Sequence, residues 1–85
     1  MITNSQTWHA FDKLAMVNNV SVSGLARRSG LDATTFNKSK RVFSSGKARW
    51  PSMSTVVKVL NALHMTMNDF ARLFQEDSPE QNNEQ

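Results

Sequence analysis

The sequence contains no cysteine and no long apolar run, and these two absences exclude several classes of protein. Without cysteine, the chain can form neither a disulfide framework nor a thiolate metal site. Its apolar stretches fall far short of the roughly 18 residues that a membrane-spanning helix requires. Its first residues also lack the charged and then apolar pattern of a secretory signal. We therefore expect a cytoplasmic protein that does not contact a membrane.

The residue combinations that catalysis or metal binding would need are missing as well. The two histidines, His9 and His64, lie far apart in the sequence without paired carboxylates beside them, so no metal site is expected. No set of nucleophile, base and orienting residue can be assembled. The three glycines, Gly24, Gly30 and Gly46, match no phosphate-cradling loop. These absences predict a protein that is not an enzyme, holds no cofactor and binds no small-molecule substrate.

Charge is unevenly distributed along the 85 residues, a length typical of one domain. Residues 1–75 contain all ten Lys and Arg and three acids, a formal charge of +7, whereas residues 76–85 are acidic and contain no apolar residue. We predict one folded domain over residues 1–75 and an acidic, disordered tail over residues 76–85. Residues 27–49 hold seven cations against Asp32 alone. Such a basic block favours a polyanionic partner, the alternative being a merely solubilising surface.

Apolar periodicity predicts an all-α domain of five helices. Intervals of three and four residues between apolar side chains, as in Val56, Val59, Leu60 and Leu63, are typical of amphipathic helices. Residues that commonly cap helices precede each expected start: Ser5, Ser21, Asp32, Ser52, and Thr66 with Asp69 three positions later. The expected helices span residues 6–18, 22–29, 33–41, 53–63 and 66–75.

The second and third of these helices have the form of a helix-turn-helix. Gly30 can adopt the left-handed conformation that ends the second helix, and Leu31 and Phe36 can pack beneath both helices. Phe36 is the one large apolar residue of the third helix before Val42, so the remaining small polar residues would face outward. A helix of this kind can approach base edges in the major groove.

These residues resemble the phage Cro/C1-repressor (lambda-repressor-like) helix-turn-helix family, a bundle of about five helices. The resemblance covers roughly residues 8–74 and runs through Leu25-Ala26, Gly30-Leu31, Phe36, Pro51-Ser52 and the 63–66 segment. More narrowly, residues 23–41 and Arg49-Trp50-Pro51-Ser52 are similar to the DNA-binding half of bacterial repressors of the S24-peptidase type.

Three positions depart from the pattern of that family. Val22 stands where many members have a Gln that touches a phosphate, and Ala33 and Thr34 stand where Gln-type base readers are usual. His64 replaces a customary glycine, but His tolerates a left-handed conformation better than most residues. Base reading should therefore depend more on methyl contacts and on the polar residues that follow in the third helix.

The resemblance implies sequence-specific binding of double-stranded DNA by a transcriptional regulator of the repressor type. Asn suits adenine and Lys suits the acceptors of guanine, so the expected base-reading residues are Ala33, Thr34, Asn37 and Lys38. The expected phosphate contacts are Ser21, Ser23, Arg27, Arg28, Thr35, Lys40, Arg41, Lys47 and Arg49. The alternative is a protein-interaction module that reuses the same bundle and has only non-specific affinity for DNA.

Two further expectations concern apolar side chains. Trp8 and Phe43 are expected in the core or at its edge, and Met16, Met53, Met65 and Met67 are expected to fill gaps within it. Trp50 is expected to pack over the edge of the core, the alternative being contact with a sugar-phosphate backbone. Leu73 and Phe74 lie near the end of the folded region, where a small bundle has little left to cover them. We expect these two residues to form the interface of a weak homodimer.

Overall fold

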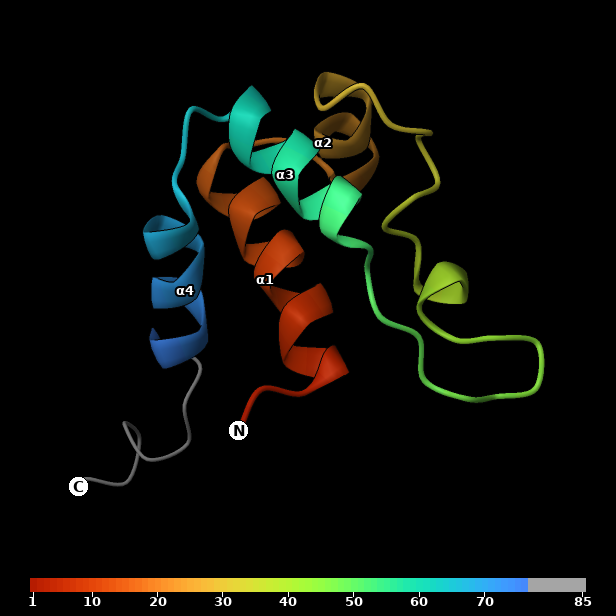
Figure 1. Ribbon diagram of the computed structural model, residues 1–85. Helices are drawn as coiled ribbons and strands as arrows, with labels where there is room; N and C mark the ends of the chain where they lie inside the picture. Colours follow the sequence, from red (N-terminus) through yellow and green to blue (C-terminus); the bar gives the residue numbers. More distant parts are fainter. Residues whose placement is uncertain (77–85) are drawn as a thin grey trace.

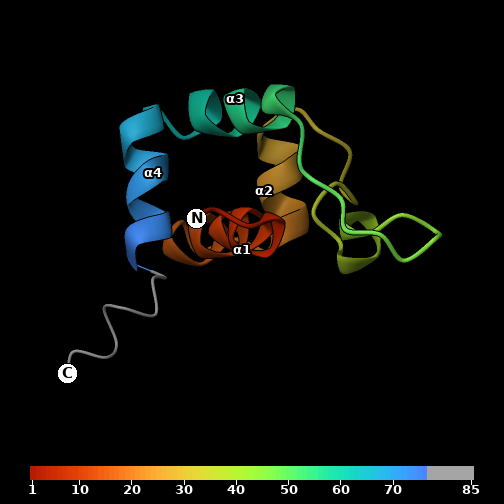
Figure 2. The ribbon, with the colours of Figure 1, turned by 60° about the horizontal axis from the view of Figure 1, so that its bottom comes forward.

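The computed structural model describes residues 1–76, and within them the chain is all-helical. The α-helices are α1 (Asn4–Val17), α2 (Val22–Arg28), α3 (Met53–Ala62) and α4 (Met67–Glu76), and a short 3₁₀ helix, η1 (Lys38–Arg41), lies between α2 and α3. α1 packs against α2 and α4, and α2 packs against α3. Figure 1 shows α1 in the middle of the domain, and in Figure 2 α3 bridges α2 on one side and α4 on the other.

Three of the four α-helices end in the same way, with one left-handed residue. Asn19, Gly30 and His64 have φ angles of 60°, 77° and 56° and follow the last turns of α1, α2 and α3. The amide of the next residue then bonds back to a carbonyl of the last helical turn, as in a Schellman motif. These bonds are Val20 N to Ala15 O (3.0 Å), Leu31 N to Ala26 O (2.8 Å) and Met65 N to Leu60 O (2.9 Å). The left-handed conformations predicted for Gly30 and His64 are confirmed.

Hydroxyl caps begin most of the helices where the sequence predicts them. The hydroxyls of Ser21 and Ser52 accept the amides of residues 24 and 55, each at 3.0 Å. Thr66 and Asp69 bond reciprocally as a capping box. The predicted cap of the first helix, Ser5, is wrong, because Thr3 caps α1 two residues earlier. Its side chain and that of Gln6 exchange the two bonds of a capping box, at 3.1 Å and 2.8 Å.

The core is centred on the Phe11 ring of α1. Phe36 stacks on it with ring centroids 4.7 Å apart, and Phe70 of α4 approaches it at 5.6 Å. Phe11 and Phe36 are fully buried, together with Leu25 of α2 and Val59 of α3. One hydrophobic core of aromatic and aliphatic side chains therefore joins all four α-helices to the segment that follows α2, and the burial predicted for Phe36 is confirmed.

The α-helix predicted over residues 33–41 is wrong. Residues 33–36 form turns, Asn37 is extended with a ψ of 148°, and η1 follows it. The backbone bonds here join residues three apart: Thr35 N to Asp32 O, Asn37 N to Thr34 O, and Lys40 N to Asn37 O. The reason is competition from side chains. The Thr35 hydroxyl bonds the Asp32 carbonyl at 2.6 Å, and the Arg41 guanidinium takes the carbonyl of Phe36. The described residues thus hold four α-helices and one 3₁₀ helix, and the five-helix count is not reproduced.

Two of the three aromatic residues expected in the core or at its edge lie outside it. Trp8 is buried, but Trp50 is 57% exposed and Phe43 is 51% exposed. The reason is that residues 42–50 form a loop on the surface, which the bond from the Trp8 indole N–H to the Arg49 carbonyl ties to the edge of the core. The gap-filling role is also wrong for three exposed methionines, Met16, Met53 and Met67, whereas Met65 packs against the core.

The acidic tail is predicted to begin at Glu76, but Glu76 is the last residue of α4, so the helix extends one residue beyond the predicted boundary. The rest of the predicted tail of residues 76–85, residues 77–85, lies outside the described residues. Within residues 1–76, no helix is long and apolar enough to cross a membrane.

Candidate nucleic-acid interface

The four residues expected to read bases lie together on one short surface segment. We call residues 32–40, between α2 and Arg41, the reading segment. Thr34, Asn37 and Lys38 are exposed in it, and Ala33 is half-buried. Lys38 also lines a cleft of about 560 Å³ between the outer face of α1 and the loop around Gly46. The reading segment therefore presents small polar groups and two ammonium groups, those of Lys38 and Lys40, to solvent, on turns and a 3₁₀ helix.

Asp32 organises the first turn of the reading segment. Its carboxylate accepts the Thr34 hydroxyl at 2.6 Å and the Thr34 amide at 2.8 Å. These two bonds, the side-chain bond foremost, lower the pKa of Asp32 below its ordinary value, with a smaller contribution from the charge of Lys40. The carboxylate predicted to cap a helix therefore caps a turn, and it stays ionised at neutral pH.

The expected phosphate contacts on α2 lie at its two ends. Arg27 and Arg28 are exposed in its last turn, where their charge complements the helix dipole. At the other end, the Ser21 hydroxyl is engaged in capping and lies 3.1 Å from the hydroxyl of Ser23. Thr35, expected to contact a phosphate from the reading segment, instead donates its hydroxyl to the Asp32 carbonyl. The arginines of α2 thus face solvent, whereas all three hydroxyls already have bonding partners within the protein.

The loop over residues 42–49 brings two more of the expected phosphate contacts to the same side. It is closed by an antiparallel bridge between Val42 and Ala48. Its end is tied to α1, because the Trp8 indole N–H donates to the carbonyl of Arg49 at 2.7 Å. Lys47 and Arg49 are exposed, and the Arg49 guanidinium lies over the Phe43 ring, 5.4 Å from its centroid. In Figures 1 and 2 this loop, α2 and the reading segment lie on the side of the domain opposite α4.

Arg41 differs from the other expected phosphate contacts, because its guanidinium faces the protein. Its two terminal nitrogens bond the two carboxylate oxygens of Asp12, at 2.7 Å and 3.1 Å. Nε and Nη2 also donate to the Phe36 carbonyl, at 3.2 Å and 2.8 Å, and the guanidinium lies 5.6 Å from the centroid of the Trp8 ring. The Arg41 side chain is only 17% exposed. This geometry does not fit the role of a phosphate contact that the sequence predicted for Arg41.

Asp12 and Trp8 are the site residues that the sequence analysis missed. They lie on α1, 29 and 33 positions before Arg41, and no motif or spacing connects residues so far apart. The only signal was that Asp12 is the single acid of the first helix, which by itself does not name a partner.

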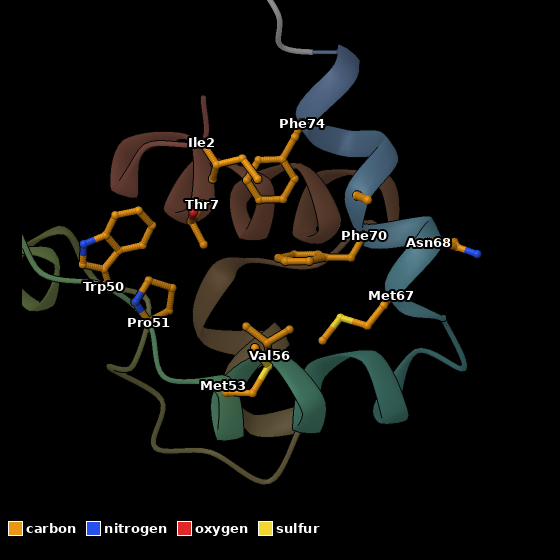
Figure 3. A pocket seen from close by; sticks show the side chains of 11 residues that line it. Ile2, Thr7, Trp50, Pro51, Met53, Val56, Met67, Asn68, Phe70 and Phe74 are labelled. Atoms are coloured by element: carbon orange, nitrogen blue, oxygen red, sulfur yellow. The ribbon is translucent and has the colours of Figure 1, made fainter.

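The residues expected at a dimer interface, Leu73 and Phe74, are half-buried and pack against the core. Phe74 meets Phe70 edge-on, with ring centroids 5.3 Å apart. Beside Phe74 lies an apolar pocket of about 490 Å³ between the start of α1, residues 50–51, α3 and α4 (Figure 3). Its exposed apolar lining residues, which the sequence analysis did not single out for this role, are Ile2, Trp50, Met53 and Met67.

Among residues 1–76, no group of three or more His, Cys, Asp or Glu side chains is placed to hold a metal ion. Comparison of the chain with protein-family models, with curated proteins and with solved structures finds no match.

Proposed function

We propose that this domain binds double-stranded DNA sequence-specifically and acts in the cytoplasm as a transcriptional regulator of the repressor type. The observation that carries the proposal is that three segments on one side of the domain, opposite α4, contain exposed cations (Figures 1 and 2). They come from α2, the reading segment and the 42–49 loop: Arg27, Arg28, Lys38, Lys40, Lys47 and Arg49. Asp32 is the one acid in this part of the sequence, and its carboxylate is engaged by Thr34. A surface of this kind matches the charge of a phosphate backbone.

The small polar residues among these cations support base recognition in addition to backbone binding. Asn37 and Lys38 are exposed side by side, and Thr34 offers a methyl group to a thymine. The resemblance of residues 23–41 to repressors of the Cro/C1 type supports the same assignment. Because the reading segment is not an α-helix, we propose that a turn and a 3₁₀ helix approach the base edges. The Lys47 and Arg49 loop then holds the flanking backbone.

The test is selection of duplexes from a random library, followed by titration of the preferred duplex at several salt concentrations. Each phosphate contact contributes about −0.9 to the slope of log K against log salt, so six contacts give a slope of about −5. We expect binding to the selected duplex to survive excess random-sequence competitor. A slope near zero, or a library that yields no preferred sequence, would refute the proposal.

The apolar pocket beside Phe74 favours a second function, that of a protein-interaction module with only non-specific affinity for DNA. Exposed apolar surface of this kind is common at protein interfaces. The competitor experiment separates the two functions. An interaction module would bind DNA weakly, in a salt-sensitive manner and without preference for any sequence.

We further propose that the domain acts as a weak homodimer on a palindromic site. One reading segment covers only a few base pairs, and two-fold dimers read two half-sites about 34 Å apart. Leu73 and Phe74 are packed against the core, so the contact would come from the neighbouring exposed side chains, in particular Met53 and Met67.

Sedimentation with and without the selected duplex measures the dimer. We expect the double variant Met53→Ser, Met67→Ser to bind a half-site normally but to lose cooperative binding of the full site. Met16→Ser is the matched control, because Met16 is exposed on α1 and does not line the pocket. Equal cooperativity in the double variant and the control would exclude this interface.

A further inference from the structure

Arg41 connects α1 to the middle and to the C-terminal end of the reading segment. Its own backbone lies at the C-terminal end of η1, and its guanidinium bonds the Phe36 carbonyl at the preceding turn. The same guanidinium makes a bidentate contact with the Asp12 carboxylate, and Asp12 belongs to α1, the longest helix of the described chain. A planar guanidinium can make these four bonds at once, whereas a lysine ammonium cannot present the same fork.

The bond from the Arg41 guanidinium to the Phe36 carbonyl affects the conformation of the local backbone. In an α-helix through residues 33–41, that carbonyl would accept the amide of Lys40. Here the Lys40 amide bonds the Asn37 carbonyl at 2.9 Å instead, and the Phe36 carbonyl is bonded by Arg41. The position of Asn37, extended between a turn and η1, is therefore coupled to the Asp12–Arg41 pair.

Burial separates Arg41 from the other cations of this surface. The Asp12–Arg41 pair is partly buried, with side-chain exposures of 31% and 17%, and the guanidinium lies over the Trp8 ring. Arg28, Lys38 and Lys40 are exposed. A guanidinium that makes four hydrogen bonds within the protein has only one of its five N–H donors left for a phosphate.

We propose that the Asp12–Arg41 ion pair clamps the reading segment onto α1 and sets the sequence selectivity of DNA binding, with Arg41 acting as a positioning residue that does not touch DNA. This inference rests on the proposed DNA-binding function. It predicts that loss of either partner lowers discrimination between sequences, while the electrostatic attraction to any duplex persists.

The experiment compares Arg41→Ala, Arg41→Lys and Asp12→Asn with wild type. Two quantities are measured for each protein: the salt slope, and the ratio of the Kd for a random duplex to the Kd for the selected duplex. We expect all three variants to lose about tenfold or more in this ratio, equivalent to about 1.4 kcal/mol, with an unchanged slope. The double variant Asp12→Asn, Arg41→Ala should lose no more than either single variant, because the two residues act through one contact.

A phosphate-contact role for Arg41 makes the opposite predictions. Arg41→Ala would then reduce the magnitude of the slope by about 0.9 and weaken both duplexes alike, and Arg41→Lys would restore binding. Asp12→Asn, which removes a negative charge, would strengthen binding to every sequence. Arg28→Ala is the control expected to behave as a phosphate contact. Any of these results at position 12 or 41 would overturn the clamp.

Hydrogen exchange without DNA tests the clamp independently of the proposed function. In the variants the amides of Thr35, Asn37 and Lys40 should exchange faster, while those of Val56 and Leu60 in α3 should exchange as in wild type, which also shows that the fold is intact. If wild type selects no duplex, the proposed function fails, yet this readout still tests the clamp. Unchanged exchange in the reading segment would overturn the clamp even in a selective DNA-binding protein.

Discussion

The four α-helices and the reading segment of this domain are stabilised by different kinds of contact. The helices begin at hydroxyl caps and share a core of buried apolar side chains, and α1, α2 and α3 end in left-handed residues. The reading segment contributes one buried side chain to that core, Phe36, and is otherwise held by polar side chains such as those of Asp32 and Arg41. Apolar burial thus builds a rigid support, and directional polar bonds shape the surface that meets a partner.

The largest effect is expected on the free energy of unfolding, at Phe36, the residue of the reading segment that is buried in the helical core. Phe36→Ala removes the ring that stacks on Phe11, and a fully buried Phe changed to Ala costs about 3–5 kcal/mol. Thermal or urea unfolding measures this loss. Phe43→Ala is the control, because Phe43 is half-exposed on the loop and its removal should change the midpoint little. Similar unfolding midpoints for the Phe36 variant and wild type would contradict the described core.

An intermediate effect is expected within the reading segment, on binding and not on stability. Lys38→Ala should change which sequence is preferred, since a specific base contact is worth about 1–3 kcal/mol of discrimination. Lys40→Ala should weaken all sequences alike and reduce the salt slope by about 0.9. Both side chains are exposed, so neither variant should alter the melting temperature. Selection from a random library with each variant gives the answer, and two identical sequence profiles would remove Lys38 from the base-reading set.

The smallest effect, on stability in acid, is expected from two surface carboxylates, Asp69 in the helical region and Asp32 in the reading segment. The Thr66 amide lowers the pKa of Asp69, and the Thr34 hydroxyl lowers that of Asp32. A carboxylate with a lowered folded-state pKa stabilises the fold above its ordinary pKa, and this contribution is lost as the pH falls through the lowered value. Asp69→Asn should therefore flatten the fall of the melting temperature in acid. Asp32→Asn should chiefly speed amide exchange at Thr34, and acid melting curves identical to wild type for both variants would contradict the caps.

Much of the helical support could be predicted from local sequence. Ser21, Ser52 and Thr66 begin helices, and Gly30 and His64 end them, because hydroxyl caps and left-handed residues act through bonds to amides and carbonyls only a few positions away. The burial of Phe36 also followed from the sequence, since it is the one large apolar residue between Leu31 and Val42.

Contacts between residues far apart in the sequence determine the features that local sequence patterns did not predict, namely the backbone of the reading segment and the exposure of Trp50. Asp12 and Trp8 engage Arg41 from α1, and the resulting bond to the Phe36 carbonyl replaces an α-helical bond in the segment where a helix was expected. Trp50 resembles a core residue in sequence, yet the carbonyl of Arg49 is tied to Trp8 and leaves Trp50 at the surface. Helix caps and apolar periodicity depend on residues that are close together in the sequence, so they can be predicted from the sequence alone. The partner of a guanidinium and the burial of a lone aromatic ring depend on which distant elements meet, and these were set only by the tertiary structure.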